Sequence, residues 1–374
     1  MSVLTDDLLA RIHARAEGYD RDNAFFAEDL AELSAAGYLA PRPLLEVMRD
    51  QRRLAAAAPA TALGIGMHLI VTGLARTLAE RGEESLRWIL EEAAAGEVFA
   101  FGNSEAGNDL VMWDARTRME RVEGGYAVTG TKIFTSLSPG WTRLSVFGRE
   151  ETADGPRLVH GVIARDGAGA AVEGLEIVED WDTLGMRATQ SHTTRLHGVV
   201  IPDARITRFL PVGPNADPYI FALFANFLLV VGAVYAGIAD RALELAVEAA
   251  HRRTSMKNDG APYSADPDIR WRVAEAALTL DGLRPELEGL ARDVDEKADH
   301  GADWFRYLTG AKHRATEAAR RVVDEAMRVA GGGAYRSSAE LSRLQRDVLA
   351  GVYHPSDTES VHATVATRLL GPLP

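Results

Sequence analysis

Ala330-Gly331-Gly332-Gly333-Ala334-Tyr335 is the stretch that decides the fold, and it precedes the run Arg343-Leu344-Gln345-Arg346-Asp347 and the run Tyr353-His354-Pro355-Ser356-Asp357. Three glycines after an apolar helix can be a simple helix stop, because glycine accepts the left-handed backbone at a helix C-terminus. The same glycines would let the backbone approach a pyrophosphate group closely, with N–H groups pointing at the anion. The stretch taken alone leaves both interpretations open.

Length and composition limit the classes of protein to consider. The chain has 374 residues, which predicts two or three domains, and its 47% hydrophobic and 25% charged content is ordinary for a globular protein. A net charge of −13 argues against nucleic acid as a partner, because phosphate neutralisation needs a basic face. With no cysteine, disulfides, thiolate metal sites and cysteine nucleophiles are excluded, which is consistent with the cytoplasm.

The N-terminal residues 1–7 lack a basic region followed by an apolar stretch, so no signal peptide is predicted. Residues 219–239 contain no charge and approach the length of a membrane span. They contain Asn226 and run directly into an amphipathic segment, as does a helix that is buried on all sides in a large bundle. We therefore expect a buried helix and no membrane partner.

The periodicity of apolar residues changes twice along the chain. Residues 1–96 show helical spacing and form the first expected domain, and residues 97–207 contain short alternating segments typical of a β domain, with a hairpin turn at Gly124-Gly125. Residues 208–374 return to helical spacing. Candidate helices there cover 218–253, 267–297, 302–330 and 338–351, which predicts an antiparallel four-helix bundle.

Several common motifs are absent or incomplete. Gly64-Ile65-Gly66 begins like a dinucleotide fingerprint but lacks the third glycine and the preceding strand. The glycine trio lacks the Gly-Lys-Ser/Thr ending of a phosphate loop, and no Gly-x-Ser-x-Gly elbow is present. The ten histidines show no helical metal-ligand spacing, so we expect no metal site.

Two runs in the middle region complete the pattern: Phe101-Gly102-Asn103-Ser104-Glu105 and Gly130-Thr131-Lys132-Ile133-Phe134-Thr135-Ser136. Together with the C-terminal runs, they resemble the flavin site of the acyl-CoA dehydrogenase superfamily. The resemblance covers nearly the whole chain. It implies an α+β fold with an N-terminal all-α domain, a middle β-barrel domain and a C-terminal four-helix bundle. It also implies FAD, or FMN or another reduced flavin, as the cofactor.

The resemblance assigns roles to individual residues. In relatives the first run meets the pyrimidine edge of the flavin, a role that falls on Asn103 and Ser104 beside Phe101. Phe134 would pack on the flavin, Thr135 would also bind the cofactor, and the Ser136 hydroxyl would lie near N5. The alternative for Phe134 is a core aromatic, and for Ser136 a strand hydroxyl.

Three glycines and one arginine are assigned to the phosphate end of the cofactor. Gly331, Gly332 and Gly333 would lie against it, and Arg253 resembles a helix-end arginine that reaches a flavin phosphate across a subunit interface. A guanidinium group suits phosphate, although a solvated arginine is the alternative. The resemblance thus implies a homo-dimer or homo-tetramer.

One departure from the family concerns the catalytic base. Acyl-CoA dehydrogenases take a proton from Cα of a thioester with a glutamate that commonly follows the Arg-Asp arginine by nine residues, and here that position is Pro355. One resolution is a displaced carboxylate, Asp357 or Glu359, with an acyl-thioester substrate and an electron-transfer flavoprotein as partner.

The other resolution is the flavin-dependent monooxygenase branch of the superfamily, which receives reduced flavin from a separate reductase and oxygenates C, N or S through a C4a-hydroperoxide. Its members place a serine near N5, here Ser136, and histidines near the peroxide, here His354 and His68. A histidine can donate or accept a proton near neutral pH, although His354 could instead cap the backbone of its loop. A third possibility is a scaffold that has lost its cofactor and serves as a binding partner.

Overall fold

The computed structural model describes residues 2–373. Five helices come first: α1 (Asp6–Asp22), α2 (Ala27–Ala35), α3 (Leu44–Ala57), α4 (Pro59–Glu80) and α5 (Arg87–Ala94). The alanine-rich stretch around Pro59 is two helices. Because proline has no N–H to donate, it fits the first position of a new helix, and α4 begins there.

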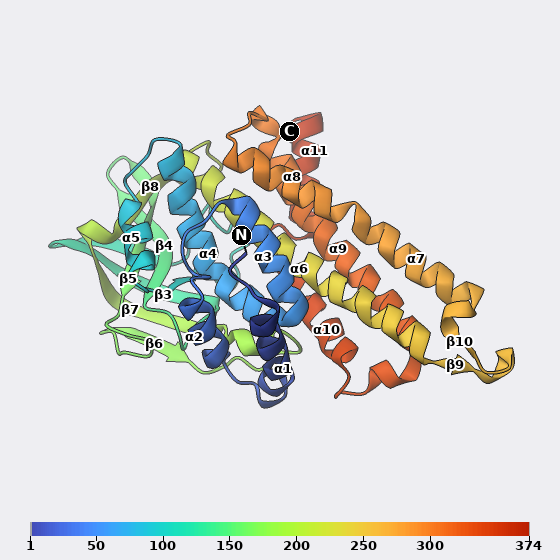
Figure 1. Cartoon of the computed structure of the whole chain (residues 1–374). Coiled ribbons are helices and arrows are strands. Elements are labelled where there is room, and N and C mark those ends of the chain that lie inside the picture. The colour runs from blue at the N-terminus through green and yellow to red at the C-terminus, as the bar shows by residue number, and fades with distance from the viewer. Residues whose placement is uncertain (1, 374) are drawn as a thin grey trace.

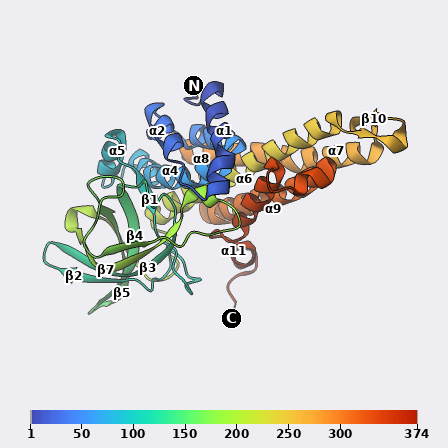
Figure 2. The same cartoon turned by 90° about the horizontal axis from the view of Figure 1, so that it is seen from below.

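A single curved sheet follows, and it forms the middle domain (Figure 2). Its strand order is β6-β7-β3-β2-β4-β5-β8, and β1 pairs with β4. Gly124 makes the turn between β2 and β3 with φ +75°, as its position between two alternating segments predicts. The strands are β1 (Phe99–Phe101), β2 (Arg118–Val122), β3 (Gly125–Thr135), β4 (Arg143–Thr152), β5 (Gly155–Ala164), β6 (Leu175–Val178), β7 (His192–Pro202) and β8 (Ile206–Pro211).

Long helices form the third part of the molecule and extend away from the sheet (Figures 1 and 2). They are α6 (Pro218–Arg252), α7 (Pro267–Asp281), α8 (Leu283–Asp295), α9 (Trp304–Ala330), α10 (Glu340–Val348) and α11 (Thr358–Leu370), with a small hairpin of β9 (Thr254–Ser255) and β10 (Ala261–Pro262) after α6.

Two details of this bundle differ from the sequence-based prediction. The expected helix 267–297 is broken, because Gly282 separates α7 from α8 and Pro285 could not continue α7, since its ring would meet the carbonyl of Asp281. The terminal helix α11 was not predicted. Its start is fixed by Asp357, whose side chain accepts a hydrogen bond from the Ser360 N–H at 2.9 Å.

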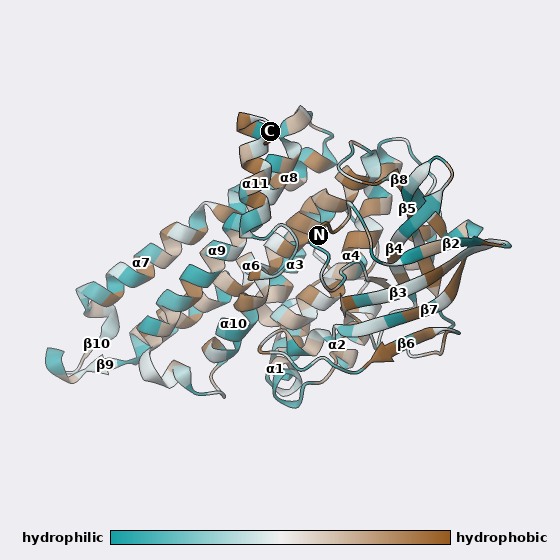
Figure 3. Ribbon diagram, turned by 180° about the vertical axis from the view of Figure 1, so that it is seen from behind, coloured by the Kyte–Doolittle hydropathy of each residue, from teal (hydrophilic) through white to brown (hydrophobic). Residues whose placement is uncertain are grey.

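The core lies where the first helices meet α6. Two helices, α4 and α6, are long and apolar enough to cross a membrane, but 83% and 94% of their most apolar windows are buried inside the protein. Hydropathy colouring shows brown along α4 and on the strands, whereas teal and pale residues alternate along the outer helix α7 (Figure 3). The prediction of a buried α6 is therefore confirmed.

Candidate functional site

A cavity of about 490 Å³ lies between the sheet and the helices, and we call it the first cavity. Its wall is built from α4, the end of β3, residues 181–191, α6 and residues 349–355. Five of the predicted site residues line it: Phe101, Ser104, Phe134, Ser136 and His354. Residues separated by more than two hundred positions in the sequence therefore meet at one hollow.

Phe134 projects into this hollow because the backbone of β3 is irregular there. The pairing of β3 with β7 shifts register between Lys132 and Thr135, and Phe134 has φ +57°, which is unfavourable for a bulky side chain. Its ring is 53% exposed and meets Trp181 edge-on at 6.0 Å. The strained backbone thus holds an aromatic face free in the cavity.

Behind Phe134 a row of hydroxyl groups ends at a carbonyl. Ser136 Oγ lies 2.8 Å from Ser191 Oγ, Ser191 Oγ lies 2.7 Å from Thr189 Oγ1, and Thr189 Oγ1 donates to the Met186 carbonyl at 2.8 Å. Each hydroxyl has one proton to donate. Since Thr189 donates to the carbonyl, Ser191 donates to Thr189 and Ser136 donates to Ser191. Ser136 therefore faces the cavity as a hydrogen-bond acceptor.

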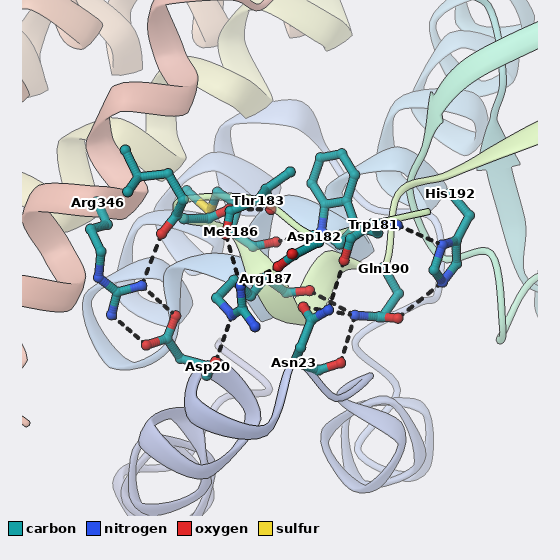
Figure 4. Close-up of polar contacts among 12 residues, drawn as sticks. Asp20, Asn23, Trp181, Asp182, Thr183, Met186, Arg187, Gln190, His192 and Arg346 are labelled. Carbon is teal, nitrogen blue, oxygen red and sulfur yellow. Dashed lines mark hydrogen bonds and ion pairs between the residues drawn. The ribbon is translucent and has the colours of Figure 1, made fainter. Parts of the chain in front are cut away.

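Residues 181–191, which include Thr189 and Ser191, are held by polar contacts to the end of α1 and to α10 (Figure 4). Arg346 binds the carboxylate of Asp20 and donates to the Leu184 carbonyl at 2.9 Å. The Asn23 amide donates to the Trp181 carbonyl at 2.7 Å. These contacts connect the N-terminal helices and the bundle to one wall of the first cavity.

His354 lines the first cavity, and its Nε2 is buried without a hydrogen-bond partner. Its loop is held by Lys312 of α9, whose ammonium group donates to the carbonyls of Gly351, His354 and Ser356 at 3.1 Å each. Burial, with a smaller contribution from the Lys312 charge, lowers the pKa of His354 well below its usual range. The imidazole is therefore neutral at pH 7.

His68 does not reach the cavity. The Phe99 N–H donates to its Nδ1 at 3.1 Å, so Nε2 carries the proton and donates to the Leu39 carbonyl at 2.9 Å. The ring is fully buried, and both nitrogens are used to join α4 to β1 and to the loop before α3. The expectation that His68 lies near a reacting group is wrong for this reason.

The run 101–105 forms another part of the wall, supported by a buried ion pair. Lys132 donates to Glu105 at 2.8 Å, and although burial opposes ionisation, this contact lowers the pKa of Glu105 to about 2. Ser104 lines the cavity, whereas Asn103 is 3% exposed and its amide contacts the Met112 sulfur. Thr135 is fully buried behind Phe134, and its Oγ1 has no partner.

A second cavity of about 330 Å³ adjoins the first and shares Phe101, Ser104 and Phe134 with it. It lies between the loop after β1 and helices α6, α9 and α11. Asp357 lines it while capping α11, so one of its carboxylate oxygens is already used. Glu359, in the first turn of α11, is exposed.

Arg253 follows the end of α6, and Gly331, Gly332 and Gly333 follow the end of α9. Helices α6 and α9 extend away from the sheet (Figure 1). Gly331 has φ +69°, and a Cβ on it would lie 2.5 Å from the Arg253 guanidinium. Arg253 donates to the Val329 carbonyl at 2.9 Å and lies over the Tyr263 ring. Gly332 and Gly333 are exposed beside it. A single chain thus brings the arginine to the glycines but not to the first cavity.

Three site residues were missed by the sequence analysis: Thr189, Ser191 and Lys312. The first two lie in a segment without periodicity, and nothing in the sequence pairs Ser191 with Ser136. Lys312 had a usable signal, because it continues the spacing of Leu308, Ala315 and Ala319 on the buried face of α9.

Comparison with known proteins agrees with this architecture. The family model described as "Acyl-CoA dehydrogenase, C-terminal domain" matches residues 229–356. The putative acyl-CoA dehydrogenase YdbM of Bacillus subtilis is 29% identical over 91% of this chain and 89% of its own length. Over these spans the chain is similar to members of the acyl-CoA dehydrogenase superfamily.

Relatives within this superfamily differ in reaction. The amino sugar nitrososynthase RubN8 of Streptomyces rubradiris is 29% identical over 93% of this chain and 84% of its own. The solved structure of KijD3, in complex with FMN and a dTDP-linked amino-keto sugar, is 26% identical and covers 98% of this chain and 91% of that one, with a TM-score of 0.83. This acyl-CoA dehydrogenase-like chain is a flavin-dependent oxidoreductase, and its relatives include both dehydrogenases and nitrososynthases.

Proposed function

We propose that this protein is a flavin-dependent monooxygenase that uses reduced flavin delivered by a separate reductase. The observation that supports this proposal is the composition of the first cavity: among the described residues that line it there is no aspartate or glutamate. Its base is the neutral imidazole of His354. A thioester dehydrogenase needs a carboxylate within reach of the Cα proton, and this wall offers none.

The residues of the first cavity fit an isoalloxazine ring. The free face of Phe134 offers an aromatic surface for stacking, and Ser136 offers an acceptor beside it. Ser104, to which the resemblance assigns the pyrimidine edge, lines the same cavity as Phe101. Asn103 and Thr135 would act from behind this wall, by shaping the backbone of their segments.

Bound reduced flavin would supply the electrons that activate O₂, with one oxygen atom entering the substrate and the other leaving as water. Ser136 would accept a hydrogen bond from a ring N–H. His354 would hold or transfer a proton at Nε2, the atom that has no partner in this structure. Phe134 and Trp181, in edge-on contact, would exclude water from one side of the ring.

We further propose that Arg253 and the three glycines act from a second copy of the chain. Within one chain they lie away from the first cavity, and Arg253 uses only part of its set of donors. A homo-dimer or homo-tetramer would let them reach a flavin phosphate.

Thioester oxidation is the second candidate, because Asp357 lines the neighbouring cavity and YdbM is described as a putative acyl-CoA dehydrogenase. In that case the oxidant partner would be an electron-transfer flavoprotein. Asp357 would have to leave its position as the cap of α11.

An anaerobic flavin titration followed by rapid mixing with oxygen separates these functions. The proposal predicts tight binding of reduced flavin and, after oxygen is added, a transient absorbance that differs from both oxidised and reduced flavin. Protein that instead holds oxidised flavin and is bleached anaerobically by an acyl-CoA would be a dehydrogenase. Protein that binds neither form of flavin would be the scaffold.

A further inference from the structure

The second cavity differs from the first in its charged groups. Arg320 and Arg346 line the first cavity, where Arg320 is paired with Glu317 and Arg346 with Asp20, whereas no lysine, arginine or histidine is found among the described residues that line the second. The second cavity has three carboxylates, and Glu105 is neutralised by Lys132. Of the other two, Asp357 caps α11 and lies close enough to Lys312 for their charges to interact, and Asp109 is exposed, so the lining itself carries carboxylates and no cation.

Apart from these carboxylates, aromatic side chains are prominent in the lining of the second cavity. Trp113 stacks on Phe224 with ring centroids 5.8 Å apart, and Phe224 meets Phe305 at 5.4 Å. Phe101 and Phe227 lie 6.0 Å apart on the side that faces the first cavity. Such walls favour flat aromatic molecules, and aromatic faces with nearby carboxylates also favour a positive charge.

The second cavity is unsuited to a phosphate-bearing ligand. A coenzyme A thioester or a nucleotide sugar needs cationic groups at its phosphates, because desolvating such an anion without a partner costs several kilocalories per mole. The second cavity provides carboxylates instead.

We propose that the second cavity holds the substrate, and that this substrate is a compact aromatic molecule without phosphate, either neutral or an amine. This inference rests on the proposed function, since it names the substrate class of the same site. The aromatic walls favour an aromatic ring, and a lining with Asp109 and Asp357 but no cation disfavours an anion.

A charge series on one ring system tests the inference. The probes are 2-naphthylmethylamine, 2-naphthylmethanol and 2-naphthoate, with coenzyme A as a phosphate-bearing competitor, each titrated calorimetrically into the full-length protein. The expected order of affinity is amine, then alcohol, then carboxylate, with no displacement by coenzyme A. Tightest binding of the carboxylate, displacement by coenzyme A, or no binding of any naphthyl probe would overturn the inference.

Three variants locate the site. Phe224→Leu should weaken all bound probes by about three- to tenfold, as loss of aromatic contacts predicts. Asp109→Asn should reduce the preference for amine over carboxylate by up to about fivefold, since the group is exposed and its charge is screened. Asp154→Asn removes an exposed carboxylate in the turn between β4 and β5 and should change nothing. Equal effects of Asp109→Asn and Asp154→Asn would contradict the proposed location.

The flavin titration is read separately from this experiment. Protein that binds reduced flavin but prefers the carboxylate probe would refute the substrate class alone. Protein that binds the amine probe but no flavin would refute the monooxygenase function alone.

Discussion

The hydroxyl oxygens of Ser136 and Ser191 lie 2.8 Å apart, and the contact commits the Ser136 proton to its neighbour. The row ends on the Met186 carbonyl, so its polarity is fixed by a group that can only accept. A ligand beside Ser136 then meets lone pairs. Under the proposed function N5 of the flavin lies beside Ser136, and because reduced flavin has an N–H at N5 where oxidised flavin has a lone pair, the row would favour the reduced state.

Removing Ser191 is expected to weaken this preference. In Ser191→Ala the Ser136 proton is free to point into the cavity, and the ratio of reduced to oxidised flavin affinity should fall about fivefold, equivalent to one hydrogen bond of ~1 kcal/mol. Anaerobic titrations with both redox states measure the ratio. Ser191→Thr keeps a hydroxyl and should restore it; an unchanged ratio in Ser191→Ala would refute the polarity argument.

His354 is expected to act in turnover more than in binding. His354→Gln keeps a polar side chain but cannot exchange a proton, so substrate oxygenation should fall by about 100-fold or more, while affinity for reduced flavin changes little. Steady-state turnover measures the oxygenation rate, and flavin titration measures the affinity for reduced flavin. A large loss of flavin affinity with normal turnover per bound flavin would assign His354 to binding instead.

The sequence predicts more of the fold than of the site, for identifiable reasons. Helix α6 is evident because its apolar run is long, and the β2–β3 hairpin is evident from Gly124-Gly125, both of which are local signals. The run 130–136, which contains Phe134 and Ser136, is also a local signal. Ser136 follows the end of β3 and Ser191 precedes β7, so their contact joins two irregular segments that no periodicity pairs.

Lys312 illustrates a different difficulty. Its spacing on α9 places it on the buried face, but only the fold reveals that the carbonyls of Gly351, His354 and Ser356 converge on its ammonium group. Asp357 is similar: as a sequence feature it resembles a displaced base, and in the structure it caps an unpredicted helix. Side-chain roles depend on which backbone groups lie nearby, and a single sequence does not state this.

Replacing Lys312 should loosen the loop that carries His354. Lys312→Met fills a similar volume but leaves the three carbonyls without their donor, and each unsatisfied buried group costs about 1–3 kcal/mol. We expect a lower Tm and faster hydrogen exchange across residues 351–357. Lys257→Met, at an exposed position after α6, is the control. Unchanged exchange at 351–357 would show that the loop is held by other contacts.

Arg253 is expected to recognise phosphate and not the flavin ring. In Arg253→Ala the affinity for FMN should fall by about tenfold or more, whereas riboflavin, which lacks the phosphate, should bind as before. Sedimentation of the same preparations measures the oligomeric state, and the proposal requires a homo-dimer or homo-tetramer. If Arg320→Ala shows this selective loss and Arg253→Ala does not, the phosphate is held within one chain, because Arg320 lines the first cavity.

Asp347 offers a test of how the first cavity's wall is held. Its Oδ1 accepts a hydrogen bond from the Met186 N–H at 2.6 Å, and burial raises its pKa to about 6, although Arg343 opposes the shift. A carboxyl whose folded pKa exceeds its unfolded value stabilises the fold at low pH, and this contribution is lost as pH rises through about 6.

Asp347→Asn keeps an acceptor for Met186 and removes the titration. The free energy of unfolding of the wild type, minus that of the variant, should therefore decrease as pH rises from about 4 to 7, by up to ~3 kcal/mol. Urea unfolding across this pH range measures the difference. Asp347→Ala should be less stable than Asp347→Asn at every pH, because it also leaves the buried Met186 N–H without a partner. A difference between wild type and Asp347→Asn that does not vary with pH would mean that the carboxyl is solvated, and that the wall of the first cavity opens at this point.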